Sequence, residues 1–177
     1  GSRDLASELL SLAVEASNSA PEETIRYARF LLPDEKYLQA EGILIDALRL
    51  APNNVSLLSE LGSVYIRMED WSRAEQVEAT LRQIEVEEAE AAADALQVAL
   101  LQSQQRGEEV IDFLEGLVDE SGGNVQAQVA IVRSHFARGD LDSAETYVER
   151  ALAEEPDNTI MQYLGAAVDA ARGRADE

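Results

Sequence analysis

Candidate catalytic side chains are scarce in this sequence, and the most obvious of them is His135. Histidine can act as a general base or as a metal ligand near neutral pH. His135 is the only histidine in the chain, and there is no cysteine to complete a thiol dyad or a metal site. Its neighbour Ser134 would point elsewhere on a helix, because adjacent residues do not face each other. We therefore expect His135 to be a buried structural residue without a catalytic role.

Paired carboxylates, which could act as a general acid and a general base, are the second candidate. They occur at Glu22-Glu23, at Glu108-Glu109 and between Glu85 and Glu90. The first two pairs stand at expected helix starts, where negative charge complements the helix dipole, and the third group stands at an expected helix end. The segment from Asp119 to Asn124 is expected to be a helix exit and not a cation site. No segment matches a calcium loop, a phosphate loop or a metallopeptidase helix. The sequence predicts no enzyme activity, no metal site and no cofactor.

The charge balance narrows the class of partner. The chain of 177 residues has 14 Lys and Arg against 35 Asp and Glu, a formal charge of −21. A basic face that neutralises phosphates is hard to build from so few cations, so nucleic acid and anionic membranes are not expected partners. Hydrophobic residues make up 46% of the chain, enough for a sizeable core. No apolar run reaches the ~18 residues of a membrane helix. We expect a soluble protein, either cytoplasmic or periplasmic.

The elements that must position these side chains repeat along the sequence. Among the occurrences of the dipeptide Ala-Glu, those at Ala40, Ala74 and Ala144 have spacings of 34 and 70 residues. Pro52 and Pro156, which follow similar segments, are 104 residues apart. The spacing of 70 residues equals two periods of about 34 plus two residues, and the spacing of 104 equals three such periods plus the same two residues. The shared irregularity indicates a true repeat with a small insertion between about residues 80 and 122.

Each period has the spacing of two helices separated by a turn. Leu61 and Tyr65, for example, lie on one face of an expected first helix. Gly139 suits a left-handed helix stop, and Asp140 suits the N-cap of the next helix. No stretch has the alternation of a β-strand. The sequence therefore predicts an all-α chain of about nine helices in antiparallel pairs.

The motifs of these periods resemble the tetratricopeptide repeat family, in a form typical of bacterial members. The family pattern is Trp-x2-Leu-Gly-x2-Tyr, then Ala-x3-Phe-x2-Ala, then Pro. The resemblance implies a right-handed superhelical solenoid. Departures from the pattern occur at Glu78 and Val86, residues 87–123 match weakly, and Pro33 makes the register of the first full repeat uncertain. The matching segments are Leu58-x2-Leu61-Gly62-x2-Tyr65, Ala40-x3-Leu44-x2-Ala47-x4-Pro52 and Ala144-x3-Val148-x2-Ala151-x4-Pro156.

The resemblance implies a single solenoid over residues 3–177, after an expression scar at residues 1–2. It divides into a partial repeat at 3–20, repeats at about 21–54, 55–88, 89–124 and 125–158, and a partial repeat at 159–177. Because the last helix, at 160–172, lacks its expected partner, we expect a segment excised from a longer repeat protein. A natural end with an unpaired helix is the alternative. Exposed apolar groups at Ile160, Leu164 and Val168 would favour end-to-end self-association.

In this family the first helices line a concave groove, which implies a protein or peptide ligand. The family branch that grips chaperone carboxylates has Lys and Asn where this chain has Ser59, Ser63, Val129 and Arg133, so that ligand is not expected. We expect a protein-interaction scaffold; the alternative is an accessory domain of a catalytic protein. In a rival interpretation, Phe136 belongs to the core between repeats, and Arg67 and Arg133 pair with local glutamates. The predicted contact residues are Arg67, Gln97, Gln104, Arg133 and Phe136, and further groove positions are Ser56, Ser59, Ser63, Ile66, Asp94, Leu101, Gln105, Gln126 and Val129.

Overall fold

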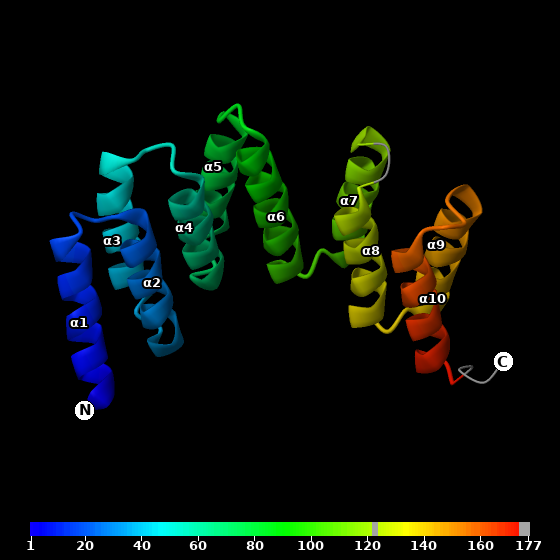
Figure 1. The fold of residues 1–177 in the computed structure, drawn as a ribbon, viewed down its shortest axis with the longest axis horizontal. Helices are drawn as coiled ribbons and strands as arrows, with labels where there is room; N and C mark the ends of the chain where they lie inside the picture. Colours follow the sequence, from blue (N-terminus) through cyan, green and yellow to red (C-terminus); the bar gives the residue numbers. More distant parts are fainter. Residues whose placement is uncertain (122–123, 174–177) are drawn as a thin grey trace. The chain divides into compact units, whose positions relative to one another are not determined.

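The computed structural model describes residues 1–121 and 124–173, and within those ranges the chain is helical with no strand (Figure 1). Gly122, Gly123 and residues 174–177 lie outside the described residues, so the expected helix exit at 119–124 and the turn after Gly173 are only partly covered. The chain forms two compact units, Gly1–Ser103 and Gln104–Glu177. The boundary falls inside the repeat predicted at 89–124, and the predicted single domain stays a prediction.

Ten α-helices make up the described part of the chain. The expected number was about nine, and the extra helix follows from the partial repeats at both ends. Unit 1 contains α1 (Ser2–Ala16), α2 (Pro21–Leu31), a 3-10 turn (Leu32–Asp34), α3 (Tyr37–Leu50), α4 (Val55–Arg67), α5 (Trp71–Arg82) and α6 (Glu87–Ser103). Unit 2 contains α7 (Gly107–Ser121), α8 (Val125–Ala137), α9 (Leu141–Glu154) and α10 (Thr159–Ala171).

Within each unit, helices that are consecutive in sequence pack against each other as antiparallel neighbours (Figure 1). The first helices of the repeats also contact one another, α2 with α4 and α4 with α6 in unit 1, and α8 with α10 in unit 2. This second set of contacts places the first helices in one layer of each unit. The all-α class and the antiparallel pairing are therefore confirmed.

Side-chain caps begin the helices at equivalent points of the repeats. Asp70 Oδ1 accepts from Arg73 N at 3.1 Å, and Asp140 Oδ1 accepts from Ser143 N at 3.1 Å. Gly139 has φ +72°, the left-handed conformation predicted for it, which glycine adopts without steric cost. Asn54, Asn124 and Asn158 cap α4, α8 and α10 in the same way.

Small residues allow the paired helices to approach closely. Ala40, Ala74 and Ala144, which defined the repeat, are completely buried. The expected exposure of α10 is only partly correct. Ile160 is exposed, but Val168 is buried because its side of α10 faces α9 and α8.

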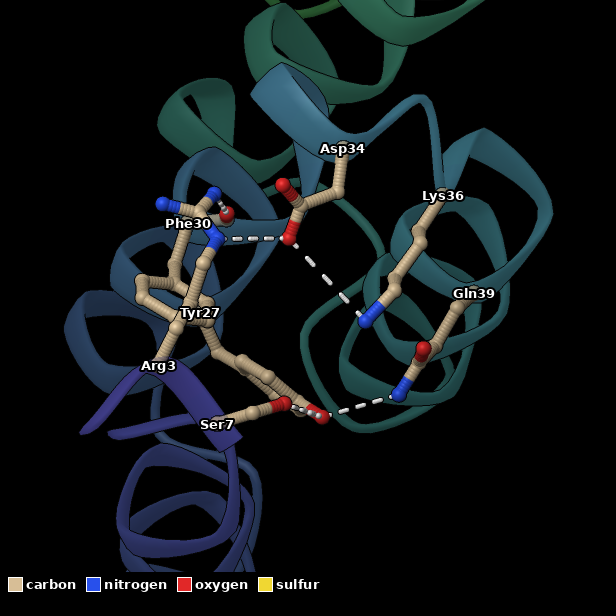
Figure 2. Close-up of polar contacts among 7 residues, drawn as sticks. All are labelled: Arg3, Ser7, Tyr27, Phe30, Asp34, Lys36 and Gln39. Carbon is tan, nitrogen blue, oxygen red and sulfur yellow. Dashed lines mark hydrogen bonds and ion pairs between the residues drawn. The ribbon is translucent and has the colours of Figure 1, made fainter. Parts of the chain in front are cut away.

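A polar cluster fixes α2 between its neighbours in unit 1 (Figure 2). The Tyr27 hydroxyl accepts from Gln39 Nε2 on α3 at 2.8 Å and lies 3.3 Å from Ser7 Oγ on α1. Arg3 Nε donates to Asp34 Oδ2 at 2.8 Å, just after α2 ends. These contacts join α1 and α3 to α2. They fix the position of α2, the helix that carries Arg29.

Candidate functional site

An open depression of about 270 Å3 runs over the first helices of unit 1. Three serines of α4, at positions 56, 59 and 63, lie in it as the repeat register predicted. α2 contributes Arg29, and α6 contributes Glu88 and Ala92. Because α2, α4 and α6 all contribute, the depression is a groove that crosses the first-helix layer.

Two of the three serine hydroxyls of the groove already donate their protons to the helix backbone. Ser59 Oγ donates to the Val55 carbonyl at 2.8 Å, and Ser63 Oγ donates to the Ser59 carbonyl at 3.0 Å. A hydroxyl has one proton but two lone pairs, so each oxygen can still accept. Ser59 and Ser63 therefore offer hydrogen-bond acceptors to the N–H groups of an extended peptide.

An ion pair joins α2 to α4 at the groove. Arg29 Nε donates to Glu60 Oε2 at 2.8 Å, and Glu60 is only 7% exposed. The positive charge of Arg29 therefore compensates the negative charge of the buried Glu60 carboxylate. The sequence did not lead us to predict either residue, although the position of Arg29 within its helix could have indicated it. Arg29, Ser63 and Arg133 all stand nine residues after the N-cap of their helix.

Within the part of the chain that the structure describes, Arg67 and Arg133 differ from the other basic residues in having no ion-pair partner. Among the Lys and Arg residues that the structure describes, every other one lies within 4.0 Å of a carboxylate oxygen. Arg67 and Arg133 are both exposed. The rival interpretation, in which these arginines pair with local glutamates, is not what the structure shows. Their guanidinium groups are available to an incoming acceptor.

The other predicted contact residues are less exposed and belong to different units. Gln97 is half-buried on α6 of unit 1, and Phe136 is half-buried on α8 of unit 2. Gln104 lies in the segment before α7, where its Oε1 accepts from Arg106 Nη1 at 2.9 Å. The five predicted residues thus form two sets, Arg67 with Gln97 in unit 1 and the remaining three in unit 2.

One further groove assignment is wrong. Leu101 is 3% exposed and belongs to the core of α6. Asp94 is half-buried and accepts from Arg82 Nη2 of α5 at 3.1 Å, so it is paired with a neighbouring helix. The error at Leu101 lies in the segment where the sequence placed its insertion and matched the repeat weakly.

His135 is buried, as expected. It is 9% exposed, and its Nδ1 has no hydrogen-bond partner among the described residues. Burial lowers its pKa, and the nearby Asp140 carboxylate, 3.9 Å from Nδ1, opposes that shift. The His135 imidazole is therefore largely shielded from solvent by the residues packed around it.

The described residues contain no helix that combines the length and the hydrophobicity needed to cross a membrane. They contain no cluster of three His, Asp or Glu side chains able to hold a metal ion.

Comparisons with known proteins identify the fold. The tetratricopeptide repeat family model matches residues 101–168. A tetratricopeptide repeat protein from Parabacteroides merdae ATCC 43184 is similar over 98% of this chain and 67% of that one, with 17% identity and a TM-score of 0.64. A thermophilic TPR protein of Thermus thermophilus is similar over 94% and 90%, with 18% identity and a TM-score of 0.54.

A third similar structure carries a description of its binding site. YrrB, described as a TPR protein with an unusual peptide-binding site, is similar over 96% of this chain and 87% of its own, with 16% identity and a TM-score of 0.52. No curated protein matches the sequence. At these identities the structural likenesses show the fold.

Proposed function

We propose that this chain, whose residues 101–168 match the tetratricopeptide repeat family model, is an interaction scaffold in which the first helices of each unit contact an extended segment of a partner protein. Domains of this family generally mediate protein–protein interaction. The main supporting observation is that Arg67 and Arg133 are exposed and have no ion-pair partner among the described residues, although carboxylates outnumber cations 35 to 14 in the chain. An arginine fork donates two parallel hydrogen bonds to a carboxylate. The proposed ligand therefore carries acidic anchors.

The groove of unit 1 supports the same proposal. Its serine oxygens accept hydrogen bonds, whereas Arg67, one helical turn beyond Ser63, donates them. An extended peptide backbone offers N–H groups to the first and carbonyl or carboxylate oxygens to the second. We expect this groove to hold a polar peptide segment through hydrogen bonds to the peptide backbone. We expect it to select segments that carry Asp or Glu side chains.

The test compares two double variants with the same change in net charge. Arg67→Ala with Arg133→Ala removes the two unpaired arginines. The matched control, Arg26→Ala with Arg49→Ala, removes two exposed arginines that each pair within their own helix. Exposed ion pairs contribute only ~0–1 kcal/mol to stability, so both variants should melt close to the parent.

The readout is a peptide library selected on the parent chain, followed by capture of partners from lysate. Selected peptides should contain Asp or Glu, and Arg67→Ala/Arg133→Ala should bind them about tenfold more weakly, because hydrogen bonds to charged groups are strong. The control variant should bind as the parent does. Equal loss in both variants would mean that only the net charge matters, and the site assignment would then be wrong.

The predicted alternative, an accessory domain of a catalytic protein, has its own test. Flanking sequence that contains further repeats supports the scaffold. A neighbouring catalytic motif supports the alternative.

A further inference from the structure

A polar pocket of about 240 Å3 opens among α7, α8 and α9 of unit 2. It is separate from the predicted groove, because none of the five predicted contact residues lines it. Val118 and Ala151 supply its apolar surface. Its polar lining consists of Glu115, Asp119, Gln128, Tyr147, Arg150 and Glu154.

Gln128 is the unusual residue of this pocket. It is 8% exposed, and its Oε1 has no hydrogen-bond partner among the described residues. Leu58 stands at the equivalent position of α4, four residues after the N-cap asparagine, and it is 5% exposed. Burying an amide without a partner is unfavourable, whereas burying a leucine is favourable. The amide torsion of glutamine is broad, so its oxygen can turn toward a donor in the pocket.

The charges around Gln128 are unbalanced. Arg150 Nη2 lies 2.8 Å from Glu115 Oε1, and its Cζ lies 5.0 Å from the centre of the Tyr147 ring. This arginine compensates Glu115. Asp119 and Glu154 have no ion pair within the part of the chain that the structure describes. The lining is thus left with two uncompensated negative charges.

The pKa of the Tyr147 hydroxyl is affected by the same charges. Burial raises the pKa of Tyr147 most, and Arg150 lowers it, while the charges of Glu115, Glu154 and Asp119 raise it further. All three carboxylates line the same pocket as the phenol. An anionic ligand would be repelled from this pocket, and a neutral one would leave both charges uncompensated.

We propose that this pocket binds the cationic side chain of a lysine or arginine of a partner protein. The nitrogen donors would satisfy Gln128 Oε1 and pair with Asp119 and Glu154, and the aliphatic stem would lie on Val118 and Ala151. No cluster of acidic side chains in the described residues is tight enough for a metal ion. An organic cation, whose donors are spread over several ångströms, fits the spacing better. The partner would then carry a basic residue as well as the acidic anchors that the groove selects.

The probe is N-acetyl-arginine amide, titrated at physiological ionic strength into 15N-labelled chain and followed by NMR at the Gln128 side-chain amide. N-acetyl-citrulline amide, which has the same shape without the charge, is the matched ligand. The arginine probe should give saturable shifts at Gln128, and the citrulline probe should bind about tenfold more weakly. Absence of saturable binding by the arginine probe, or equal binding by citrulline, would overturn the proposal.

Variants separate the pocket from the general field of an acidic chain. Gln128→Leu should fold, because Leu58 occupies the equivalent site, and it should weaken binding of the arginine probe about tenfold. For this variant, shifts are followed at the backbone amides of α7 and α9. Asp119→Asn with Glu154→Gln should weaken binding further.

The control, Glu85→Gln with Glu87→Gln, removes the same charge from an open depression of unit 1 where no buried amide lies. It should leave binding unchanged. An equal loss in this control, or undiminished binding by Gln128→Leu, would show that no built site exists. Arg67 and Arg133 are intact in all these variants, so a failure here is distinct from a failure of the groove.

Discussion

The side chain of Leu96 on α6 fills the space that a Cβ atom on Gly62 of α4 would occupy. A Cβ at position 62 would lie 2.6 Å from Leu96 Cδ2 and 2.8 Å from Cδ1. Both residues are buried, Leu96 at 5% exposure. The absence of a side chain at position 62 therefore sets how closely two first helices of unit 1 approach.

The first prediction tests this approach with Gly62→Ala. Overpacking a core costs about 1–3 kcal/mol, whereas replacing a glycine inside a helix gains about 1 kcal/mol. Leu96 is only 5% exposed, so its methyl groups have little solvent space to move into, and we expect the cost to exceed the gain. Urea unfolding should show a net loss of about 1 kcal/mol in the free energy of unfolding.

The same substitution in a Leu96→Ala background provides the control. With the methyl groups gone, only the helix-propensity gain remains, so Gly62→Ala should stabilise that background by up to about 1 kcal/mol. A loss of equal size in both backgrounds would show that Leu96 is not the residue that requires glycine.

The second prediction concerns the free energy of the buried amide at position 128. Gln128→Leu removes a buried carbonyl that lacks a partner among the described residues. We expect it to stabilise the unliganded chain by about 1–2 kcal/mol, measured by thermal or urea unfolding. Gln126→Leu changes an exposed residue of the same helix and should have little effect. Destabilisation by Gln128→Leu would indicate that the amide has a partner in solution.

The third prediction is a pH dependence of stability from His135. Its pKa is lowered from the usual 6.5 because burial disfavours the imidazolium. Below pH 6.5 the unfolded chain therefore binds a proton that the folded chain resists. This contribution to stability is fully present above the unfolded pKa and is lost as the pH falls toward the folded pKa.

His135→Phe is the comparison for this measurement. Tyr65 stands at the equivalent position of α4, so an aromatic ring suits the site. The difference in the free energy of unfolding between the parent and the variant should shift in favour of the variant as the pH falls from 7 toward 5. His135 is the only histidine, so a constant difference over that range would contradict the assigned pKa shift.

The fourth prediction tests end-to-end self-association, which stays a proposal. α1 exposes Leu5, Leu9 and Leu12 along one face, and α10 exposes Ile160 and Tyr163. If α10 of one copy packs on α1 of the next, Leu9→Lys or Tyr163→Lys alone should abolish the concentration dependence of sedimentation. A mixture of the two variants should recover dimers, because one intact α10 and one intact α1 remain. Recovery without mixing, or no association by the parent, would reject the contact.

Local and periodic features of this protein could be predicted from its sequence. Asp140 and Gly139 form the expected turn, and Ala40, Ala74 and Ala144 are completely buried as the repeat required. Capping involves atoms within about four residues of each other, and helical burial follows the 3.6-residue period. These determinants lie within short stretches of chain, so the residue order alone specified them.

Contacts between helices needed the tertiary structure. Arg29 pairs with Glu60 of the next first helix, whereas Arg67 has no ion-pair partner among the described residues, and the sequence offers 35 carboxylates to choose from. Nothing in the local pattern shows that Gln128 buries an oxygen without a described partner or that Leu101 belongs to the core. Ion pairing and desolvation depend on distances across space, and small shifts of register between α4 and α6 change those distances. The sequence therefore determined the repeats and the register that singled out Arg67 and Arg133, and the tertiary packing decided which charges and amides remain open to a ligand.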